Sequence, residues 1–274
     1  MANTVSVERD GETATVVLNR PDRLNALHLE TAQLLLTSLQ ELAQDSGVSC
    51  VVITGNGRAF CAGGDLAWAR SYAGGVGAAF HTLAGCFHQS VIEIARMEKP
   101  VIAAINGVAA GAGFSLALAC DFRILDRTAI LRQAYTSAGL CIDGGGTFML
   151  PRLVGLARAL EIAAFDRPID AERAQQFGLA LRVVDPGRSV EEARTLATEL
   201  SGASLFSFVW SKRLLRGSYE APLEIQLERE REGIAACARA PEGKEGLQAF
   251  MDKRKPDFRH ARLSMRVPAG GTSL

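Results

Sequence analysis

Hydrophobic and polar positions alternate along the chain in two different rhythms. Residues 4–9 and 13–19 alternate one by one around Asp10-Gly11, which predicts a β-hairpin. In residues 29–44, four leucines fall on one face at helical spacing, which predicts an amphipathic helix. The same reasoning predicts buried strands at 50–54, 101–105 and 122–125, and helices at 77–97, 114–120 and from 146 onward.

Strands and helices alternate through about residue 195, and from residue 205 the pattern is almost wholly helical. This alternation predicts an α/β fold whose parallel strands are joined by helical crossovers, with ligand chemistry at the strand ends. We therefore divide the chain into an α/β core at 1–200, a helical region at 201–258 and a mobile tail at 259–274. Within the helical region, amphipathic helices are predicted at 205–216, 223–238 and 243–255, with breaks at Pro222 and Pro241.

Composition narrows the function classes. The 274 residues carry 30 basic and 30 acidic side chains, and this balance argues against a nucleic-acid-binding protein. The six cysteines lie far apart without a C-x-x-C pair, so we expect most of them to be small buried residues in a reducing compartment. The N-terminus lacks the apolar core of a signal peptide, which indicates a cytoplasmic protein.

One uncharged segment, residues 101–120, is long enough to span a bilayer. Three glycines and Asn106 interrupt it, and Pro100 precedes it. The favoured interpretation is therefore a buried strand, a turn and a buried helix, with no membrane contact.

Two glycine-rich segments, 60–66 and 105–113, each follow an apolar run and lead into a predicted helix. Neither contains an obvious nucleophile, metal ligand or lysine-serine phosphate clamp, so both offer a site their backbone N–H groups. Glycine allows close approach to a ligand, and a helix N-terminus presents unpaired donors. Two such donors converging on one oxygen would form an oxyanion hole, whereas the alternative is a pair of tight turns.

An ordered set of motifs covers most of the chain: RPDRLNAL at 20–27, AFCAGGDL at 59–66, KPVIAAING at 99–107, ACD at 119–121 and FMDKRKP at 250–256. This set resembles the crotonase, or enoyl-CoA hydratase/isomerase, superfamily. The resemblance implies a spiral of ββα units, C-terminal helices that build a homotrimer or a dimer of trimers, and a coenzyme A thioester as substrate. It also implies that the N–H groups of Gly64 and Ala112 hold the thioester oxygen, and no metal or redox cofactor is expected.

The resemblance is incomplete where hydratases carry two catalytic glutamates. Those positions are Ser115 and Tyr135 here, and neither side chain replaces a base that works near neutral pH. The remaining acid in this stretch is Asp143, which is either a helix N-cap or a proton shuttle beside the thioester. For the second role we expect Leu140, Ile142 and Phe148 to enclose Asp143 and make it more basic.

Two subgroups of the superfamily have an aspartate at this position. One resembles 1,2-epoxyphenylacetyl-CoA isomerases and related enoyl-CoA isomerases, and it is favoured. The other resembles 4-chlorobenzoyl-CoA dehalogenases, in which a histidine activates water, and His88 falls near that place. A Ser115, His88 and Asp143 hydrolase set, a hydratase with non-standard acid and base, and a catalytically silent acyl-CoA binder are further alternatives.

The resemblance also implies residues that bind coenzyme A: Arg23, Ala62, Asp65, Leu66, Lys253 and Lys255. Asp65 is expected to cap a helix rather than act as a catalytic acid. Lys253 and Lys255 are expected either to reach the nucleotide of a neighbouring subunit or to be solvated surface charges. The acyl group is not determined by the sequence, although a bulky or aromatic pocket has candidate walls in Trp68, Tyr72, Phe80, Phe87 and Phe148.

Overall fold

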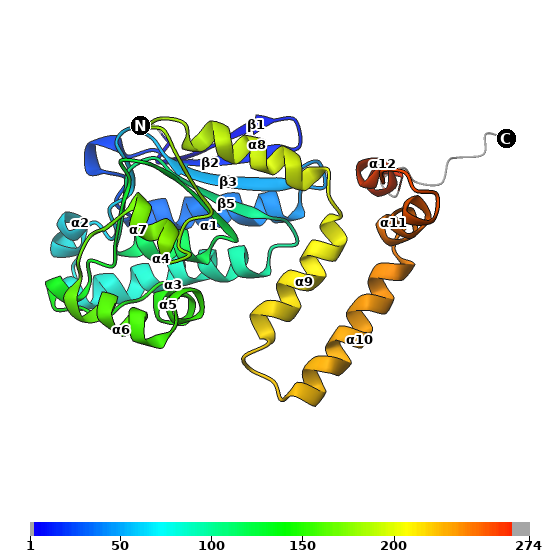
Figure 1. Cartoon of the computed structure of the whole chain (residues 1–274). Coiled ribbons are helices and arrows are strands. Elements are labelled where there is room, and N and C mark those ends of the chain that lie inside the picture. The colour runs from blue at the N-terminus through cyan, green and yellow to red at the C-terminus, as the bar shows by residue number, and fades with distance from the viewer. Residues whose placement is uncertain (1–2, 265–274) are drawn as a thin grey trace. The chain divides into compact units, whose positions relative to one another are not determined.

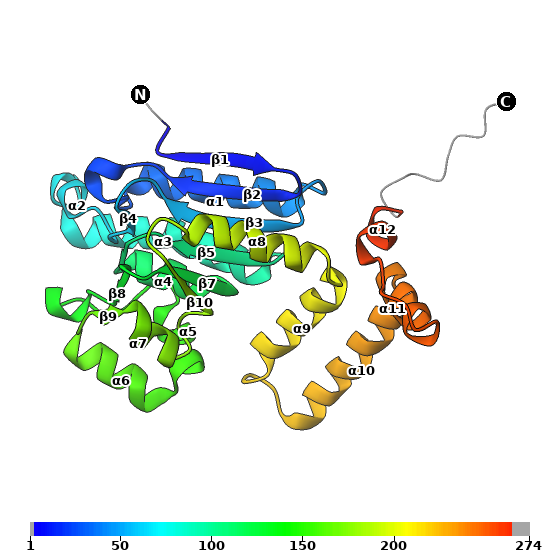
Figure 2. The same cartoon turned by 45° about the horizontal axis from the view of Figure 1, so that its top comes forward.

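The chain divides into two compact units, Met1–Ala197 and Thr198–Leu274, of which the computed structural model describes residues 3–264. The core boundary predicted at residue 200 lies close to this division. Figures 1 and 2 show strands and helices interleaved in the first unit and helices alone in the second.

A six-stranded sheet forms the centre of the first unit, in the order β1-β2-β3-β5-β7-β10. Only the β1–β2 hairpin is antiparallel, and the other neighbours run parallel. The two central strands β3 and β5 are buried throughout, as their continuous apolar runs predict. The six strands are β1 (Val5–Asp10), β2 (Thr13–Leu18), β3 (Cys50–Gly55), β5 (Val101–Ile105), β7 (Phe122–Asp126) and β10 (Arg182–Val184).

A second, four-stranded sheet has the order β4-β6-β8-β9. Its strands are β4 (Ala59–Cys61), β6 (Val108–Ala110), β8 (Ile130–Arg132) and β9 (Ile169–Asp170). The chain passes from β3 to β4, from β5 to β6 and from β7 to β8, each time from the larger sheet to the smaller one and then into helix. This repetition is the spiral of ββα units that the resemblance implies.

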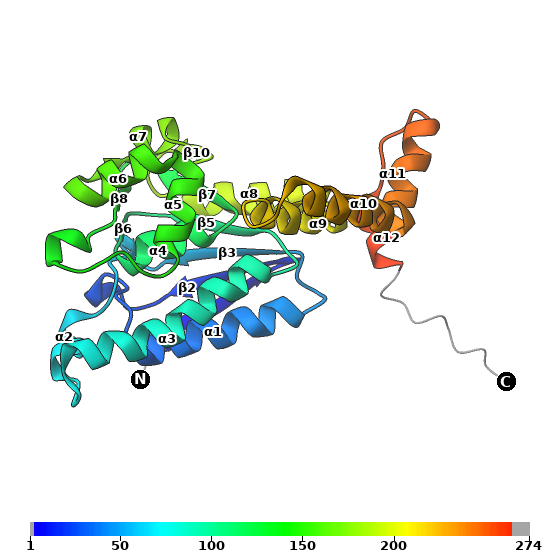
Figure 3. The same cartoon turned by 90° about the horizontal axis from the view of Figure 1, so that it is seen from below.

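Helices α1 and α3 run side by side along one face of the larger sheet (Figure 3). The leucines that predict α1 face the core, since Leu35, Leu39 and Leu42 are buried. The helices of the first unit, with two 3₁₀ turns, are η1 (Pro21–Arg23), α1 (Leu29–Gln44), α2 (Leu66–Ser71), α3 (Gly75–Arg96), α4 (Ala112–Ala119), η2 (Thr136–Ala138), α5 (Gly146–Val154), α6 (Leu156–Phe165) and α7 (Ala171–Gln176), and α8 (Ser189–Ser201) leads into the second unit.

The second unit contains α9 (Leu205–Gly217), α10 (Leu223–Arg239), α11 (Pro241–Met251) and α12 (Phe258–Leu263). Pro241 begins α11, because the first helical position needs no N–H donor. The first residues of the expected tail, 259–263, belong to α12, which Asp257 caps by accepting the His260 N–H. The rest of that expectation, residues 265–274, lies outside the described residues.

The uncharged segment 101–120 folds as β5, β6 and α4, so the interpretation as buried strand, turn and helix is confirmed. Within residues 3–264, no helix has both the length and the apolar character that crossing a bilayer requires.

Candidate active site

Two glycines let the two glycine-rich segments meet. Strands β4 and β6 pair in parallel, so the segments after them leave the same edge of the small sheet. Gly63 has φ +103° and Gly111 has φ +54°, backbone conformations that favour glycine. A Cβ atom on Gly63 would lie 3.4 Å from the Ala112 nitrogen. The segments are therefore in close contact, as an oxyanion hole made from both requires.

The Gly64 N–H points away from the segment at Leu27, with which its own segment pairs. Leu27 donates to the Gly63 carbonyl at 2.7 Å and accepts from the Asp65 N–H at 2.8 Å. In such a parallel bridge, the residue between those two partners presents its own N–H to the opposite side. That side is a cavity, which Gly64 lines.

Ala112 supplies the second donor as the first residue of α4, where backbone N–H groups have no acceptor within the helix. It lines the same cavity as Gly64. Within residues 3–264, neither the Gly64 N–H nor the Ala112 N–H donates a hydrogen bond. Both donors are available to an oxygen placed in the cavity.

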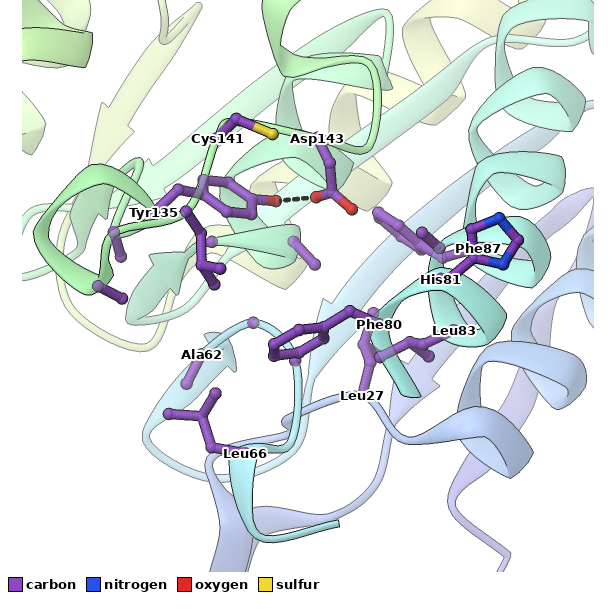
Figure 4. Close-up of a pocket in the computed structure, with 18 residues that line it drawn as sticks. Leu27, Ala62, Leu66, Phe80, His81, Leu83, Phe87, Tyr135, Cys141 and Asp143 are labelled. Carbon is purple, nitrogen blue, oxygen red and sulfur yellow. Dashed lines mark hydrogen bonds between the residues drawn. The ribbon is translucent and has the colours of Figure 1, made fainter. Parts of the chain in front are cut away.

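The cavity has a volume of about 350 Å³ and lies wholly in the first unit. Figure 4 shows Phe80 and Phe87 on the α3 side and Tyr135 and Asp143 opposite them. Its walls are mostly apolar and include the following side chains: Leu27, Ala62, Leu66, Phe80, His81, Leu83, Ala84, Phe87, Ala112, Ala134, Tyr135, Ala138, Leu140, Cys141 and Asp143. Asp143 is the only carboxylate among them.

The Asp143 carboxylate is bound through one of its oxygens. The Tyr135 hydroxyl donates to Asp143 Oδ1 at 2.5 Å (Figure 4). Tyr135 is buried with 9% of its surface exposed. Burial raises the pKa of the Tyr135 phenol, and the nearby Asp143 charge raises it further, so the phenol stays protonated. Tyr135 is therefore a hydrogen-bond donor here and not a base.

Ser115 supports the backbone of the same loop. Its hydroxyl donates to the Asp143 carbonyl at 2.7 Å and lies 3.4 Å from the Tyr135 hydroxyl. Ser115 is fully buried. Because its only proton is committed to a backbone carbonyl, this serine is not arranged as a nucleophile, and the geometry does not favour a Ser115, His88 and Asp143 hydrolase set.

His88 approaches Asp143 from α3. Its Nε2 atom lies 3.6 Å from Asp143 Oδ2 and accepts the Gly144 N–H at 3.2 Å. An amide can only donate, so Nε2 carries no proton in this arrangement and the contact with Oδ2 is not a charged hydrogen bond. Of the two histidines that sequence spacing puts on one face of α3, His81 lines the cavity and His88 does not.

The expected enclosure of Asp143 is wrong. Its side chain is 35% exposed, and Leu140 and Phe148 are themselves 40% and 38% exposed. Phe148 packs against the Arg152 guanidinium, one helical turn further along α5, rather than against Asp143. Among the candidate aromatic walls, Phe80 and Phe87 line the cavity. Trp68 and Tyr72 do not line it, and their rings contact each other at an interplanar angle of 58°.

Asp65 caps α2, as predicted, by accepting the Trp68 N–H at 3.0 Å, and it pairs with Arg20 at 2.8 Å. Burial raises the pKa of Asp65, but the Trp68 N–H and the Arg20 guanidinium outweigh it, so the pKa lies below its ordinary value. The sequence contained no signal for the Arg20 partner, which lies 45 residues away.

The remaining residues expected to bind coenzyme A occupy varied positions. Ala62 and the 59% exposed Leu66 line the cavity. Arg23 is exposed at the end of η1. Lys253 and Lys255 are exposed in the second unit. Leu27, His81 and Cys141 are cavity residues that sequence reasoning did not assign to the site. Leu27 and His81 reach it through the folding of distant segments, whereas Cys141 lies two residues before Asp143.

Comparison with known proteins extends over almost the whole chain. Residues 8–261 match the profile of the enoyl-CoA hydratase/isomerase family. The 1,2-epoxyphenylacetyl-CoA isomerase of Escherichia coli (strain K12) is 36% identical over 245 residues, covering 89% of this chain and 94% of that protein. The short-chain-enoyl-CoA hydratase of Clostridium acetobutylicum is 32% identical, covering 92% and 96%. A crystal structure of an enoyl-CoA hydratase from Polaromonas sp. JS666 superposes with a TM-score of 0.87 at 33% identity, covering 92% of this chain and 98% of that one.

Proposed function

Because the chain belongs to the enoyl-CoA hydratase/isomerase family, we propose that it shifts a double bond within an enoyl-CoA thioester, with Asp143 as the proton shuttle. Coenzyme A thioesters are consistent with the family. Relatives named as isomerases and as hydratases have similar identity to this chain, so the choice between the two reactions rests on the site.

The reaction begins with the thioester oxygen near the Gly64 and Ala112 N–H groups. Asp143 Oδ2 takes a proton from the carbon next to the carbonyl, and the electron pair of that C–H bond passes to the oxygen as an enolate. The two N–H donors stabilise the negative charge as it forms. Asp143 then returns the proton to the γ carbon, and the double bond moves from the β,γ to the α,β position.

The observation that carries the proposal is the single carboxylate in the cavity wall. Hydration by the family's two-glutamate mechanism needs a second acid, and the two expected positions are held by Ser115 and Tyr135. Both of these side chains are hydrogen-bonded to Asp143. One acid is sufficient for a reaction that removes a proton and returns it to the same molecule.

The aromatic walls support an acyl group that carries a ring. Phe80, Phe87 and Tyr135 all line the cavity, and aromatic pairs add to the burial energy of a ring. The relative named as 1,2-epoxyphenylacetyl-CoA isomerase points the same way. We therefore extend the proposal to aryl-substituted enoyl groups and to opening of an activated ring next to the thioester.

A hydrolase of the 4-chlorobenzoyl-CoA dehalogenase type is the second candidate. His88 Nε2 lies 3.6 Å from Asp143 Oδ2 and is unprotonated in this arrangement, as a base that activates water must be. Two features weigh against it: His88 does not line the cavity, and the resemblance puts Tyr135 where such a dehalogenase has a tryptophan.

Product analysis distinguishes these reactions. The protein is incubated separately with a trans-3-enoyl-CoA, a trans-2-enoyl-CoA and 4-chlorobenzoyl-CoA, and each product is identified by NMR and mass spectrometry. We expect isomerisation of the first, abolished by Asp143→Asn. Hydration of the second at a comparable rate would refute the proposal, and chloride release from the third would favour the hydrolase. Turnover of none, with normal binding of the thioesters, would indicate a silent acyl-CoA binder.

A further inference from the structure

The backbone at Tyr135 is held in place by several hydrogen bonds. Its N–H donates to Gln133 Oε1 at 3.0 Å, and its carbonyl accepts the N–H groups of Ala138 and Leu140, each at 2.9 Å. Gln133 itself is 1% exposed. Asp166 accepts the N–H of Ala134 at 2.7 Å and so holds the residue before the tyrosine. The phenol therefore projects into the cavity wall from a fixed backbone.

The Tyr135 hydroxyl has one proton and two polar neighbours. Asp143 Oδ1 lies at 2.5 Å and Ser115 Oγ at 3.4 Å. The Ser115 hydroxyl donates to the Asp143 carbonyl, so it does not compete as a donor to the carboxylate. The tyrosine proton is thus directed to Oδ1, in a short hydrogen bond to a charged acceptor.

The two oxygens of Asp143 are consequently not equivalent. Oδ1 accepts the phenol, whereas Oδ2 accepts no hydrogen bond from any of residues 3–264. His88 Nε2 lies 3.6 Å from Oδ2, but it accepts the Gly144 N–H and so carries no proton to donate. A carboxylate bound by one oxygen loses most of its rotation about the Cβ–Cγ bond. Only Oδ2 is then available to a carbon acid in the cavity.

We propose that Tyr135 is a positioning residue that holds Asp143 by Oδ1, so that Oδ2 alone takes the proton from the substrate and returns it. The inference rests on the proposed isomerase function. Two titratable side chains contact the Asp143 carboxylate, Tyr135 at 2.5 Å and His88 from α3 at 3.6 Å. His81 and Cys141 line the same cavity. Because the phenol stays protonated, its role is to donate to the carboxylate throughout the cycle.

Tyr135→Phe tests the inference, since it removes the hydroxyl and keeps the ring. A hydrogen bond to a charged group corresponds to a change of about ten- to a hundredfold. We expect kcat for a trans-3-enoyl-CoA to fall by that factor while KM changes less than threefold. Tyr72→Phe is the matched control, because Tyr72 does not line the cavity, and it should leave kcat unchanged.

The outcomes separate the inference from the proposed function. If the wild type isomerises and Asp143→Asn does not, but Tyr135→Phe keeps the wild-type kcat, the inference alone is overturned. If the wild type does not isomerise, both fall. A loss of kcat with equal loss of acyl-CoA binding and of thermal stability would mean a merely structural tyrosine and would also overturn it.

A double-mutant cycle tests the contact without the reaction. Tyr135→Phe, Asp143→Asn and the double variant are compared by thermal unfolding with the whole chain. Coupling between the two changes supports the hydrogen bond, and additive effects refute it. This measurement tests the Tyr135–Asp143 hydrogen bond even if Tyr135→Phe is too unstable for kinetic assays.

Discussion

Proline at position 112 would remove one of the two proposed oxyanion donors and would keep Asp143. Ala112 is the first residue of α4 and follows Gly111, which has φ +54° and ψ −125°. The first helical position tolerates proline, because its N–H has no acceptor within the helix. The ring carbon of Ala112→Pro takes the place of the N–H hydrogen that faces the cavity. The variant therefore deletes one of two donors and retains the helix.

The expected loss of kcat in Ala112→Pro depends on the number of donors and on their surroundings. Gly64 and Ala112 are two donors in a cavity with mostly apolar walls, where charge is poorly screened. Loss of one oxyanion donor costs about 3 kcal/mol of transition-state stabilisation, and at about 1.36 kcal/mol per factor of ten this is roughly a 160-fold loss of kcat. The dipole of α4 and the Gly64 N–H remain, so residual activity is expected.

A closely matched proline variant serves as the control. Leu156 is the first residue of α6, follows Gly155 at φ +76°, and is 66% exposed outside the cavity. Leu156→Pro should keep wild-type kcat. Both variants are assayed for isomerisation of a trans-3-enoyl-CoA, for acyl-CoA binding and for thermal unfolding. A folded Ala112→Pro protein with less than a tenfold loss of kcat would refute the oxyanion role of Ala112.

Three further perturbations test other parts of the site. Asp65→Asn keeps a capping oxygen but removes the charge that pairs with Arg20, so the wild type should be more stable to unfolding by about 1 kcal/mol. This advantage should be complete well above pH 3.8, the ordinary pKa, and should be lost as the pH falls from there through the lower pKa of the folded carboxyl. Thermal unfolding between about pH 3 and pH 6 checks this, and a constant difference contradicts it. Gly144→Ala should lower kcat at least about tenfold, because a Cβ at φ +60° would come 2.5 Å from the Phe87 ring and displace the Asp143 loop. Gly139→Ala, at φ +72° with nothing within 4 Å, should cost only about 1 kcal/mol of unfolding free energy, and equal losses of kcat in the two variants would show that backbone strain alone matters. Phe80→Ala should reduce kcat/KM for an aryl-bearing enoyl-CoA about tenfold more than for a linear one, and equal losses would remove Phe80 from the acyl pocket.

The long helices and strands could be predicted, because each contains enough residues to show a hydrophobic period. Helix α1 has the predicted bounds, and β5 also has the predicted bounds. Strands β4, β6 and β8 have three residues each, too few for an alternating pattern. The six-residue helix α2 was expected from the glycine segment before it and from Asp65 as a cap, and not from a hydrophobic period. The second sheet therefore could be expected only from the resemblance and not from periodicity.

The candidate site was predictable as a set of positions and not as a set of contacts. Asp143, Tyr135 and Ser115 meet in the structure, as their motif positions implied, but the direction of each hydrogen bond depends on how the 133–146 segment turns. The expected enclosure failed because Phe148 lies on an exposed face of α5 beside Arg152. Side-chain direction on a short helix after two left-handed glycines is not encoded in hydrophobic pattern alone.

The site leaves no room for a glutamate side chain at position 115, the first of the two hydratase positions. Ser115 is fully buried, a Cβ on Gly144 would lie 2.9 Å from its Cβ, and one on Gly146 would lie 2.8 Å from its hydroxyl. The space that a glutamate side chain needs is filled by the backbone that carries Asp143. The side chain at the first hydratase position supports the Asp143 carbonyl, and the one at the second binds its Oδ1. Because both side chains are hydrogen-bonded to Asp143, the site fits the proposed transfer of one proton by one acid better than a mechanism that uses two acids.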